Sequence, residues 1–208
     1  MHGSPPLQPV FSDNRRRLIL RHAREHFVRL GYAATRVEPI AREAGVSTAT
    51  LYALFSGKAD LFTAVIDDAA EDFARRMGSV RAVEGDARTT LTSYAAAYAD
   101  FMTDPFIRSV FRLVMAERPR FQAVAVRFYE KGRNEFGAVL IGAIERLSRA
   151  GALGPVEHPS WAAGQLLGMI EHPAFVVPLV TGDEVRMQRT PAQVASEAVE
   201  TFLARYGA

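Results

Sequence analysis

The sequence predicts an all-α protein in which a small N-terminal domain of three helices is followed by a larger helical bundle. Apolar residues recur at three- and four-residue steps along nearly the whole chain, which is the period of helices buried on one face. We find no segment with the two-residue alternation of a strand, and no internal repeat. Glycine and proline residues stand between the periodic segments, where they mark the joints.

Three parts are expected along the 208 residues. Residues 1–11 hold three prolines, but neither the charged start nor the apolar run of a signal peptide, so we expect a flexible tail. Residues 12–60 predict the three-helix domain, and residues 61–208 predict the larger bundle. No run approaches the roughly 18 apolar residues of a membrane span. The chain has no cysteine, which excludes disulfides and favours a cytoplasmic protein with no membrane partner.

The N-terminal domain is predicted to hold helices over 13–30, 36–44 and 48–55, the first of which ends at Gly31. Only residues 45–47 separate the second helix from the third, a gap that allows nothing but a sharp crossing. Two short helices joined in this way form a helix-turn-helix, here of the homeodomain-like kind.

The third helix has an apolar inner side and an outer side of small and hydroxylated residues. The inner side holds Leu51, Leu54 and Phe55, with Ser47 beside them. The outer side holds Ala49 and Ala53, flanked by Thr50 and Tyr52. Such an outer side suits the major groove of DNA, because alanine can touch a thymine methyl while hydroxyls reach base edges or phosphates. An ordinary three-helix bundle whose exposed side chains bind nothing is the open alternative.

The charge distribution agrees with a DNA-binding end. Residues 12–60 carry a net charge of +4, whereas the rest of the chain carries −2. A basic end is expected where a protein meets phosphate, although solvated faces of arginine-rich helices give the same pattern. Lys58 opens the helix that follows, where its ammonium and the free backbone amides could hold one phosphate together.

The same segment resembles the N-terminal domain of tetracycline-repressor (TetR) family regulators. The matching residues are Phe27, Gly31-Tyr32, Thr35, Ile40-Ala41, Ala44 to Ser47, Thr50 to Tyr52, Phe55, Lys58 and Leu61-Phe62. The resemblance implies a positioning helix within residues 31–44, a recognition helix over 48–54, and phosphate contacts by Tyr52 and Lys58. The expected DNA-binding residues are Thr35, Ser47, Thr48, Ala49, Thr50, Tyr52, Ala53 and Lys58. Ala53, Leu54 and Gly57 depart from residues frequent in the family, which leaves the operator sequence undetermined.

The larger domain is predicted to be helical throughout. The expected helices span 58–77, 87–102, 106–116, 120–150, 160–171 and 192–206. More weakly than the first segment, this domain resembles the C-terminal domain of the AefR-like branch of the same family. The residues that carry this likeness are 111–114, 116–117, 119–121, 128–129 and the turn at Gly151. The resemblance implies a homodimer formed by the last long helices, with an effector cavity inside each subunit.

Large and adaptable side chains in this domain could line a largely apolar pocket, and a few polar groups among them could orient a ligand. The candidates are Tyr98, Met102, Phe111, Met115, Phe128, Trp161, Gln165, Met169 and His172. The alternative is that most of these side chains belong to an ordinary hydrophobic core.

Catalysis and metal binding find no support in the sequence. His158 and His172 each stand in a Glu-His-Pro triplet, but neighbouring residues of a helix point about 100° apart, unlike the pairs that hold metals in bundles. No phosphate-binding glycine loop or nucleophile elbow occurs, and no carboxylate pair has an environment that would tune it for acid and base roles. We therefore expect no enzyme activity, no metal and no cofactor.

These observations predict a homodimeric regulator that binds a palindromic double-stranded DNA operator and is released by a small, largely apolar effector. Repression is favoured over activation only because most relatives repress. Two alternatives remain open: a helical enzyme or small-molecule carrier with an incidental helix-turn-helix, and an architectural DNA-binding protein without an effector.

Overall fold

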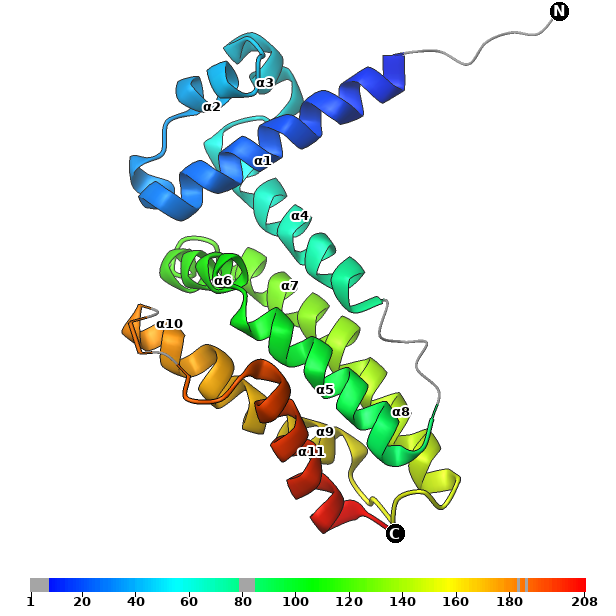
Figure 1. Cartoon of the computed structure of the whole chain (residues 1–208). Coiled ribbons are helices and arrows are strands. Elements are labelled where there is room, and N and C mark those ends of the chain that lie inside the picture. Colours follow the sequence, from blue (N-terminus) through cyan, green and yellow to red (C-terminus); the bar gives the residue numbers. More distant parts are fainter. Residues whose placement is uncertain (1–7, 79–84, 183, 186) are drawn as a thin grey trace, which may run out of the picture. The chain divides into compact units, whose positions relative to one another are not determined.

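The computed structural model describes residues 8–78, 85–182, 184–185 and 187–208. Over these residues the chain is helical with no strand, which confirms the all-α prediction (Figure 1). The chain divides into two compact units. Unit 1 comprises residues up to Ala69 together with Leu113–Ala125, and unit 2 comprises Ala70–Arg112 and Val126–Ala208.

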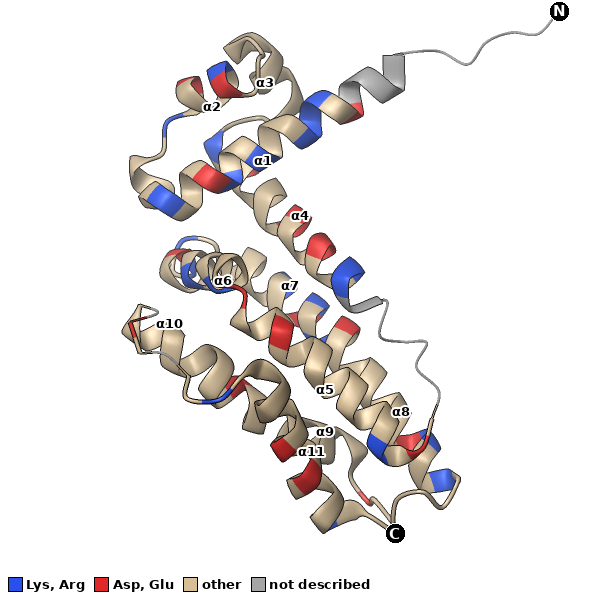
Figure 2. Cartoon of the chain, in the orientation of Figure 1, with Lys and Arg blue, Asp and Glu red and all other residues tan. Residues whose placement is uncertain are grey.

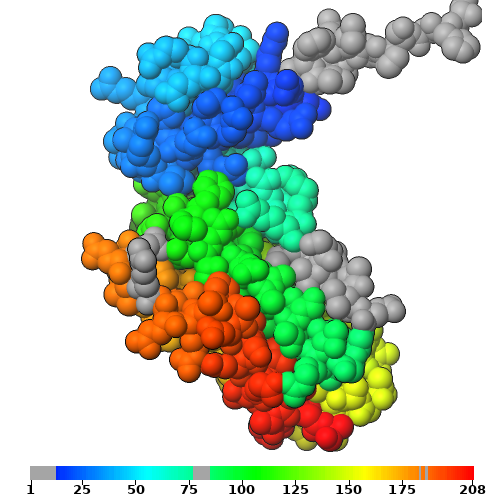
Figure 3. All heavy atoms as spheres, viewed as in Figure 1, coloured from blue at the N-terminus to red at the C-terminus, as the bar shows by residue number. Residues whose placement is uncertain are grey.

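Unit 1 contains the predicted helix-turn-helix. Its helices are α1 (Gln8–Ala34), α2 (Val37–Glu43), α3 (Thr48–Leu54) and the first part of α4 (Lys58–Gly78). Their apolar faces enclose a core that includes Phe27, Ile40, Leu51 and Phe62, each no more than 1% exposed. Figure 3 shows the atoms of α1 to α3, blue to cyan, as one filled body.

Helix α1 begins at Gln8, inside the segment 1–11 that was predicted to be a flexible tail, whose residues 1–7 lie outside the described part. The predicted stop at Gly31 is present as a break, since this glycine has φ 73° and ψ 172° within the α1 span. Only glycine adopts that backbone readily, so the residues after it form a separate short turn of helix.

The domain boundary differs from the sequence prediction. The prediction ended the first domain at residue 60, whereas unit 1 extends to Ala69 and also takes in Leu113–Ala125. The reason is tertiary: Phe62 of α4 stacks on Phe121, a residue distant in sequence, with ring centroids 4.5 Å apart. Sequence periodicity cannot show such a pairing, because it reports only which face of a helix is buried.

Unit 2 is a helical bundle. Its helices are α5 (Ala87–Thr103), most of α6 (Pro105–Glu117), most of α7 (Gln122–Gly132), α8 (Ala138–Arg149), α9 (Pro159–Glu171), α10 (Val177–Thr181) and α11 (Pro191–Tyr206). Helix α11 packs along α5 and α9 (Figure 1). Leu91, Leu166, Val199 and Phe202 are among its fully buried side chains.

Two π-helical segments join helices in this unit. The segment Arg133–Gly137 connects α7 to α8, and His172–Val176 connects α9 to α10. The expected helix over 160–171 therefore ended too early, because the helix continues through His172 and Pro173. A π turn shifts the hydrogen-bond register by one residue, which accommodates a proline that has no N–H to donate.

The continuous helix from Pro159 to Thr181 is unusually apolar. Over its 23 residues the most apolar window has a mean hydropathy of 1.3, so by length and composition it could cross a membrane. The core helix of a bundle passes the same test, and here 28% of that window is buried. Sequence inspection, which looked for an uninterrupted apolar run, did not single out this segment.

Candidate nucleic-acid interface and internal cavity

Helix α3 is fixed at both ends and along its inner face. Ser47 caps its start, with Oγ accepting a hydrogen bond from the backbone N–H of Thr50 at 3.0 Å. The Ser47 and Thr50 hydroxyls are 2.8 Å apart, so they are also hydrogen-bonded. Leu51 and Phe55 are at most 2% exposed and hold the helix to the core of unit 1. These contacts determine which side of α3 faces outward.

The outward side of α3 has the composition that the sequence predicted. Thr48, Ala49 and Ala53 are exposed, and the Tyr52 side chain is 49% exposed. The turn before α3 passes through Gly45 at φ 68°, a left-handed conformation that brings α2 and α3 close together. The result is an exposed short helix with small side chains, bordered by two hydroxyls, at the surface of unit 1.

Thr35 was expected to contact DNA, but its side chain points into the protein. It is 2% exposed, and its hydroxyl donates to the backbone oxygen of Gly31 at 2.7 Å. The hydroxyl is also 3.2 Å from the backbone oxygen of His26. This side chain therefore closes the end of α1 rather than reaching a phosphate.

Lys58 is held by the same end of α1. Its Nζ donates to the backbone oxygens of Tyr32, Ala33 and Thr35 at 2.8, 3.2 and 2.9 Å. The ammonium also lies 4.5 Å from the centroid of the Tyr32 ring. An ammonium group has three N–H donors, and all three have a carbonyl within reach. Lys58 thereby binds the backbone carbonyls at the end of α1 and just before α2.

Exposed basic side chains lie on α1 and at the ends of α2. Arg15, Arg16, Arg17 and Arg21 are exposed along α1, where Figure 2 shows a concentration of blue. Arg36 and Arg42 are exposed at the two ends of α2. These side chains supply the positive charge that a polyanionic partner would meet.

A histidine pair ties α1 to α2. His26 Nε2 is 2.9 Å from Glu43 Oε2, and His22 Nδ1 is 3.9 Å from the same oxygen. The hydrogen bond with His26 holds the pKa of Glu43 below its ordinary value, with smaller help from the nearby positive charges. His26 is 4% exposed, so this contact fixes the position of α2 from within unit 1.

The turn between α6 and α7 also belongs to unit 1. Glu117, the last residue of α6, accepts a hydrogen bond from the backbone N–H of Tyr32 at 3.2 Å. Phe121 packs against the Tyr32 ring with centroids 4.8 Å apart, and Arg120 lies 5.0 Å over the same ring. Tyr32, directly after the Gly31 break, is therefore held by α4 and by the end of α6.

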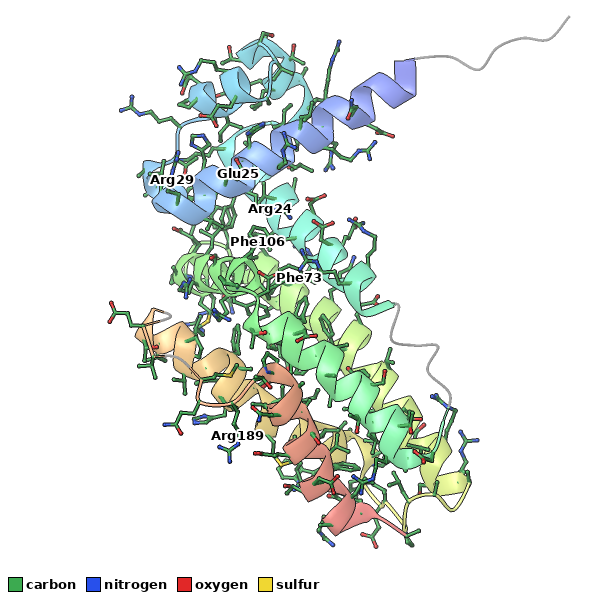
Figure 4. All side chains as sticks on the ribbon, in the orientation of Figure 1. Arg24, Glu25, Arg29, Phe73, Phe106 and Arg189 are labelled. Carbon is green, nitrogen blue, oxygen red and sulfur yellow. The ribbon has the colours of Figure 1, made fainter. Side chains whose placement is uncertain are left out.

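Unit 2 contains a partly open cavity of about 720 Å³. Aromatic side chains form much of its wall: Phe73 at the C-terminal part of α4 (labelled in Figure 4), Tyr98, Phe111, Phe128, Phe136 and Phe175. Phe111 contacts Phe128 and Phe175 edge to face, with ring centroids 4.9 and 4.8 Å away. The predicted candidates Tyr98, Met102, Phe111 and Phe128 all line this cavity.

The other five candidates lie elsewhere. Met115 is 56% exposed and belongs to the part of α6 in unit 1, and Trp161 is 69% exposed. Gln165 is exposed and accepts a hydrogen bond from the Tyr206 hydroxyl at 2.6 Å, while His172 is exposed. Met169 lines a separate pocket of about 400 Å³ beside α11. For the candidates on α9 the phase of the helix explains the miss, because this helix turns Ser160, Ala163, Gly164, Leu167 and Glu171 toward the cavity.

Sequence reasoning missed Glu171 as a cavity residue. Its Oε1 accepts a hydrogen bond from the Tyr98 hydroxyl. Burial raises the pKa of Tyr98 well above its usual value, and the Glu171 charge raises it further, so the phenol remains a donor. A signal was present, since Glu171 is the one charged residue between Pro159 and Thr181.

Another side of the same helix carries exposed apolar side chains. Trp161, Val176 and Val180 are 69%, 41% and 80% exposed, and Val176 also lines the cavity. Gln165, Gly168 and His172 are exposed between them. A Cβ added at Gly168 would meet nothing within 4 Å, so another helix could approach closely at this point. We call this surface the α9–α10 stripe.

Both parts of the chain match models of known protein families. Residues 19–65 match the family model described as bacterial regulatory proteins, tetR family. Residues 89–208 match the model described as the C-terminal domain of AefR-like transcriptional repressors. Both matches confirm the resemblances seen in the sequence.

Individual relatives agree with these matches. A TetR-family transcriptional regulator from Mesorhizobium loti MAFF303099 has a similar structure, with a TM-score of 0.78 and 26% identity, covering 95% of this chain and 98% of that one. The flavonoid-responsive regulator FrrA has a TM-score of 0.69 and 25% identity, covering 94% and 98% of the two chains. The HTH-type transcriptional activator FasR of Mycolicibacterium smegmatis is 34% identical over 90 residues, which are 43% of this chain and 41% of FasR. The match thus spans about two fifths of that curated relative.

Proposed function

We propose that this chain, which belongs to the TetR family of bacterial transcriptional regulators, is a homodimeric repressor that binds a palindromic operator and leaves it when a small molecule occupies its cavity. The observation that carries the proposal is the exposed face of α3, where Ala49, Tyr52 and Ala53 are accessible while Leu51 is fully buried. A helix presented in this way can enter a major groove with its backbone close to the bases.

The surface around α3 supports contact with the DNA backbone. The Tyr52 hydroxyl and the exposed arginines of α1 and α2 could reach phosphates on either side of the groove. Thr35 and Lys58 have a structural role in this proposal. Their hydrogen bonds hold the end of α1, and α3 packs in the same unit. Phosphate contact by Lys58 would require it to release carbonyl oxygens that it now holds.

Dimerisation is supported by the α9–α10 stripe. Three large apolar side chains are exposed on one side of a single helix, and exposed apolar patches of this kind mark protein interfaces. A second copy of the chain is the expected partner, because a two-fold interface uses the same patch twice. Two recognition helices spaced by one DNA turn, about 34 Å, would then read a palindrome.

Release by a ligand is supported by the cavity and by α6. Phe111 of α6 lines the cavity in unit 2, whereas Glu117, at the end of the same helix, holds the backbone of Tyr32 in unit 1. A ligand that favours one position of α6 would lower DNA affinity by its differential binding to the two states. Flavonoid responsiveness in the name of FrrA provides a precedent among the structural relatives.

The direction of regulation is proposed as repression. The matched C-terminal model is described as belonging to transcriptional repressors, although FasR is named an activator. Transcription from a promoter carrying the bound operator, with and without the protein, decides between the two. Increased transcription on adding the protein would contradict repression.

Operator binding is tested by selecting bound sequences from random DNA and measuring their affinity at several salt concentrations. We expect Tyr52→Ala to weaken binding about five- to tenfold on all selected sequences, through loss of one hydroxyl contact. Ala53→Ser should instead change which sequences are selected. Tyr129→Ala is the matched control, because Tyr129 is 68% exposed but lies in unit 2. Equal losses for Tyr52→Ala and Tyr129→Ala, or no salt-dependent binding, would contradict the proposal.

A further inference from the structure

The cavity in unit 2 combines aromatic walls with one well-placed carboxylate. Phe73, Phe111 and Phe128 form an aromatic group in which Phe111 and Phe128 meet edge to face. Phe136 lies 5.9 Å from Tyr98, ring centre to ring centre, on a neighbouring part of the wall. Ring faces on several sides favour a flat, multi-ring ligand, because offset and edge-on ring contacts add to the burial of apolar area.

Glu171 brings a negative charge to this apolar wall. It is only partly exposed, and the Tyr98 hydroxyl donates to Oε1 and so fixes the orientation of the carboxylate. Within the described residues, no partner is recorded for the other oxygen, Oε2. A carboxylate accepts several hydrogen bonds, so Oε2 remains able to accept one from a ligand.

The cations of the cavity lining do not neutralise Glu171. Lys131 Nζ is 3.6 Å from Glu71 Oε1, so its charge is already paired outside the lining. Arg133 is exposed, and Glu135 adds a second carboxylate to the same stretch of wall. A ligand carrying its own carboxylate would therefore meet repulsion at Glu171, whereas a donor group would gain a charge-assisted hydrogen bond.

From this geometry we propose that the cavity binds a multi-ring apolar molecule carrying a hydrogen-bond donor, a phenolic hydroxyl or an ammonium, that donates to Glu171. This inference rests on the proposed function, which treats the cavity as a ligand site. It adds the chemistry of the ligand. Glu171 is the residue that discriminates between ligands, and Tyr98 is the residue that positions it.

Three fluorescent probes with one ring system test this selectivity: 1-hydroxypyrene, 1-pyrenemethylamine and 1-pyrenecarboxylic acid. Their dissociation constants are measured by fluorescence titration of the full chain at neutral pH. We expect the hydroxyl and the amine to bind at least tenfold more tightly than the carboxylate, since one charge-assisted hydrogen bond is replaced by repulsion. Equal or tighter binding of the carboxylate, or binding of none of the three probes, would overturn the proposal.

Glu171→Gln removes the charge while keeping an oxygen that can accept from Tyr98. We expect this variant to bind the amine about tenfold more weakly and the carboxylate no more weakly than the unsubstituted chain. Glu145→Gln is the matched control, because Glu145 is exposed on α8 and outside the cavity lining. Unchanged amine affinity in a folded Glu171→Gln chain would overturn the proposal. If that variant fails to fold, the ranking of the three probes on the unsubstituted chain still tests it.

DNA affinity, measured with and without the best probe, separates this inference from the proposed function. Binding that depends on Glu171 but leaves DNA affinity unchanged would support the ligand chemistry and contradict ligand-controlled release. Weaker DNA binding with the amine, but not with the carboxylate at the same concentration, would support both.

Discussion

Lys58 offers the sharpest test of how the DNA-binding unit is held together. Its ammonium is hydrogen-bonded to three backbone oxygens at the end of α1, and Lys58→Met removes that ammonium while keeping most of the apolar stem. A hydrogen bond to a charged group contributes about 1.5–3 kcal/mol. The site is half-buried and water can replace part of the loss, so we expect a total cost of about 2 kcal/mol rather than the sum of three bonds. For a chain of this length that cost lowers Tm by about 4–8 °C.

Thermal or urea unfolding of the variant measures this cost, and DNA binding at several salt concentrations separates it from a phosphate contact. Loss of a phosphate contact would reduce the slope of log affinity against log salt by about 1, whereas loss of a structural contact leaves the slope unchanged. Lys131→Met is the matched control, because the chain's other lysine makes a single ion pair at the surface. A Lys58→Met chain as stable as the control, with a reduced salt slope, would refute the structural interpretation.

Two further predictions concern α2 and the α9–α10 stripe. The pKa of Glu43 is lowered in the folded state, so its contribution to stability is fully present above the ordinary value of 4.5 and is lost as the pH falls through the lower folded value. Glu43→Gln should therefore lower the urea midpoint at pH 7, and the difference from the unsubstituted chain should shrink below pH 4.5; a difference independent of pH would contradict this account. Val180→Asp should convert a dimer into a 22.9 kDa monomer in sedimentation, whereas Val185→Asp, outside the stripe, should not; a monomeric unsubstituted chain would contradict the interface.

The local features of unit 1 were predictable because they depend on residues close in sequence. The spacing of Leu51 and Phe55 determines the buried side of α3, so the exposure of Ala49 and Ala53 follows without tertiary information. The break at Gly31 was equally accessible, since a positive φ favours glycine over other residues. The helices of unit 1 and the direction of their buried faces could therefore be predicted from the hydrophobic periodicity and the positions of the glycines alone.

Side chains whose roles depend on distant partners were harder to assign. Thr35 and Lys58 match family positions, but their hydroxyl and ammonium bond to the end of α1, and only the folded chain shows which carbonyls are left unpaired there. Trp161 was selected because it is large and apolar, although its position on α9 puts it on the exposed side.

Glu171 illustrates the opposite error. Selection by apolar character excluded the one acidic residue of a long apolar helix, yet an ionised carboxylate in such a helix is costly unless something compensates for its burial. The Tyr98 hydroxyl compensates for one of its oxygens. If a ligand donor compensates for the other, then the amine probe should stabilise the unsubstituted chain more than Glu171→Gln at the same free concentration of probe, because the variant binds it more weakly. Equal thermal shifts in the unsubstituted chain and Glu171→Gln would show that the Glu171 carboxylate does not interact with the ligand. Its role would then be limited to the packing of α5 against α9.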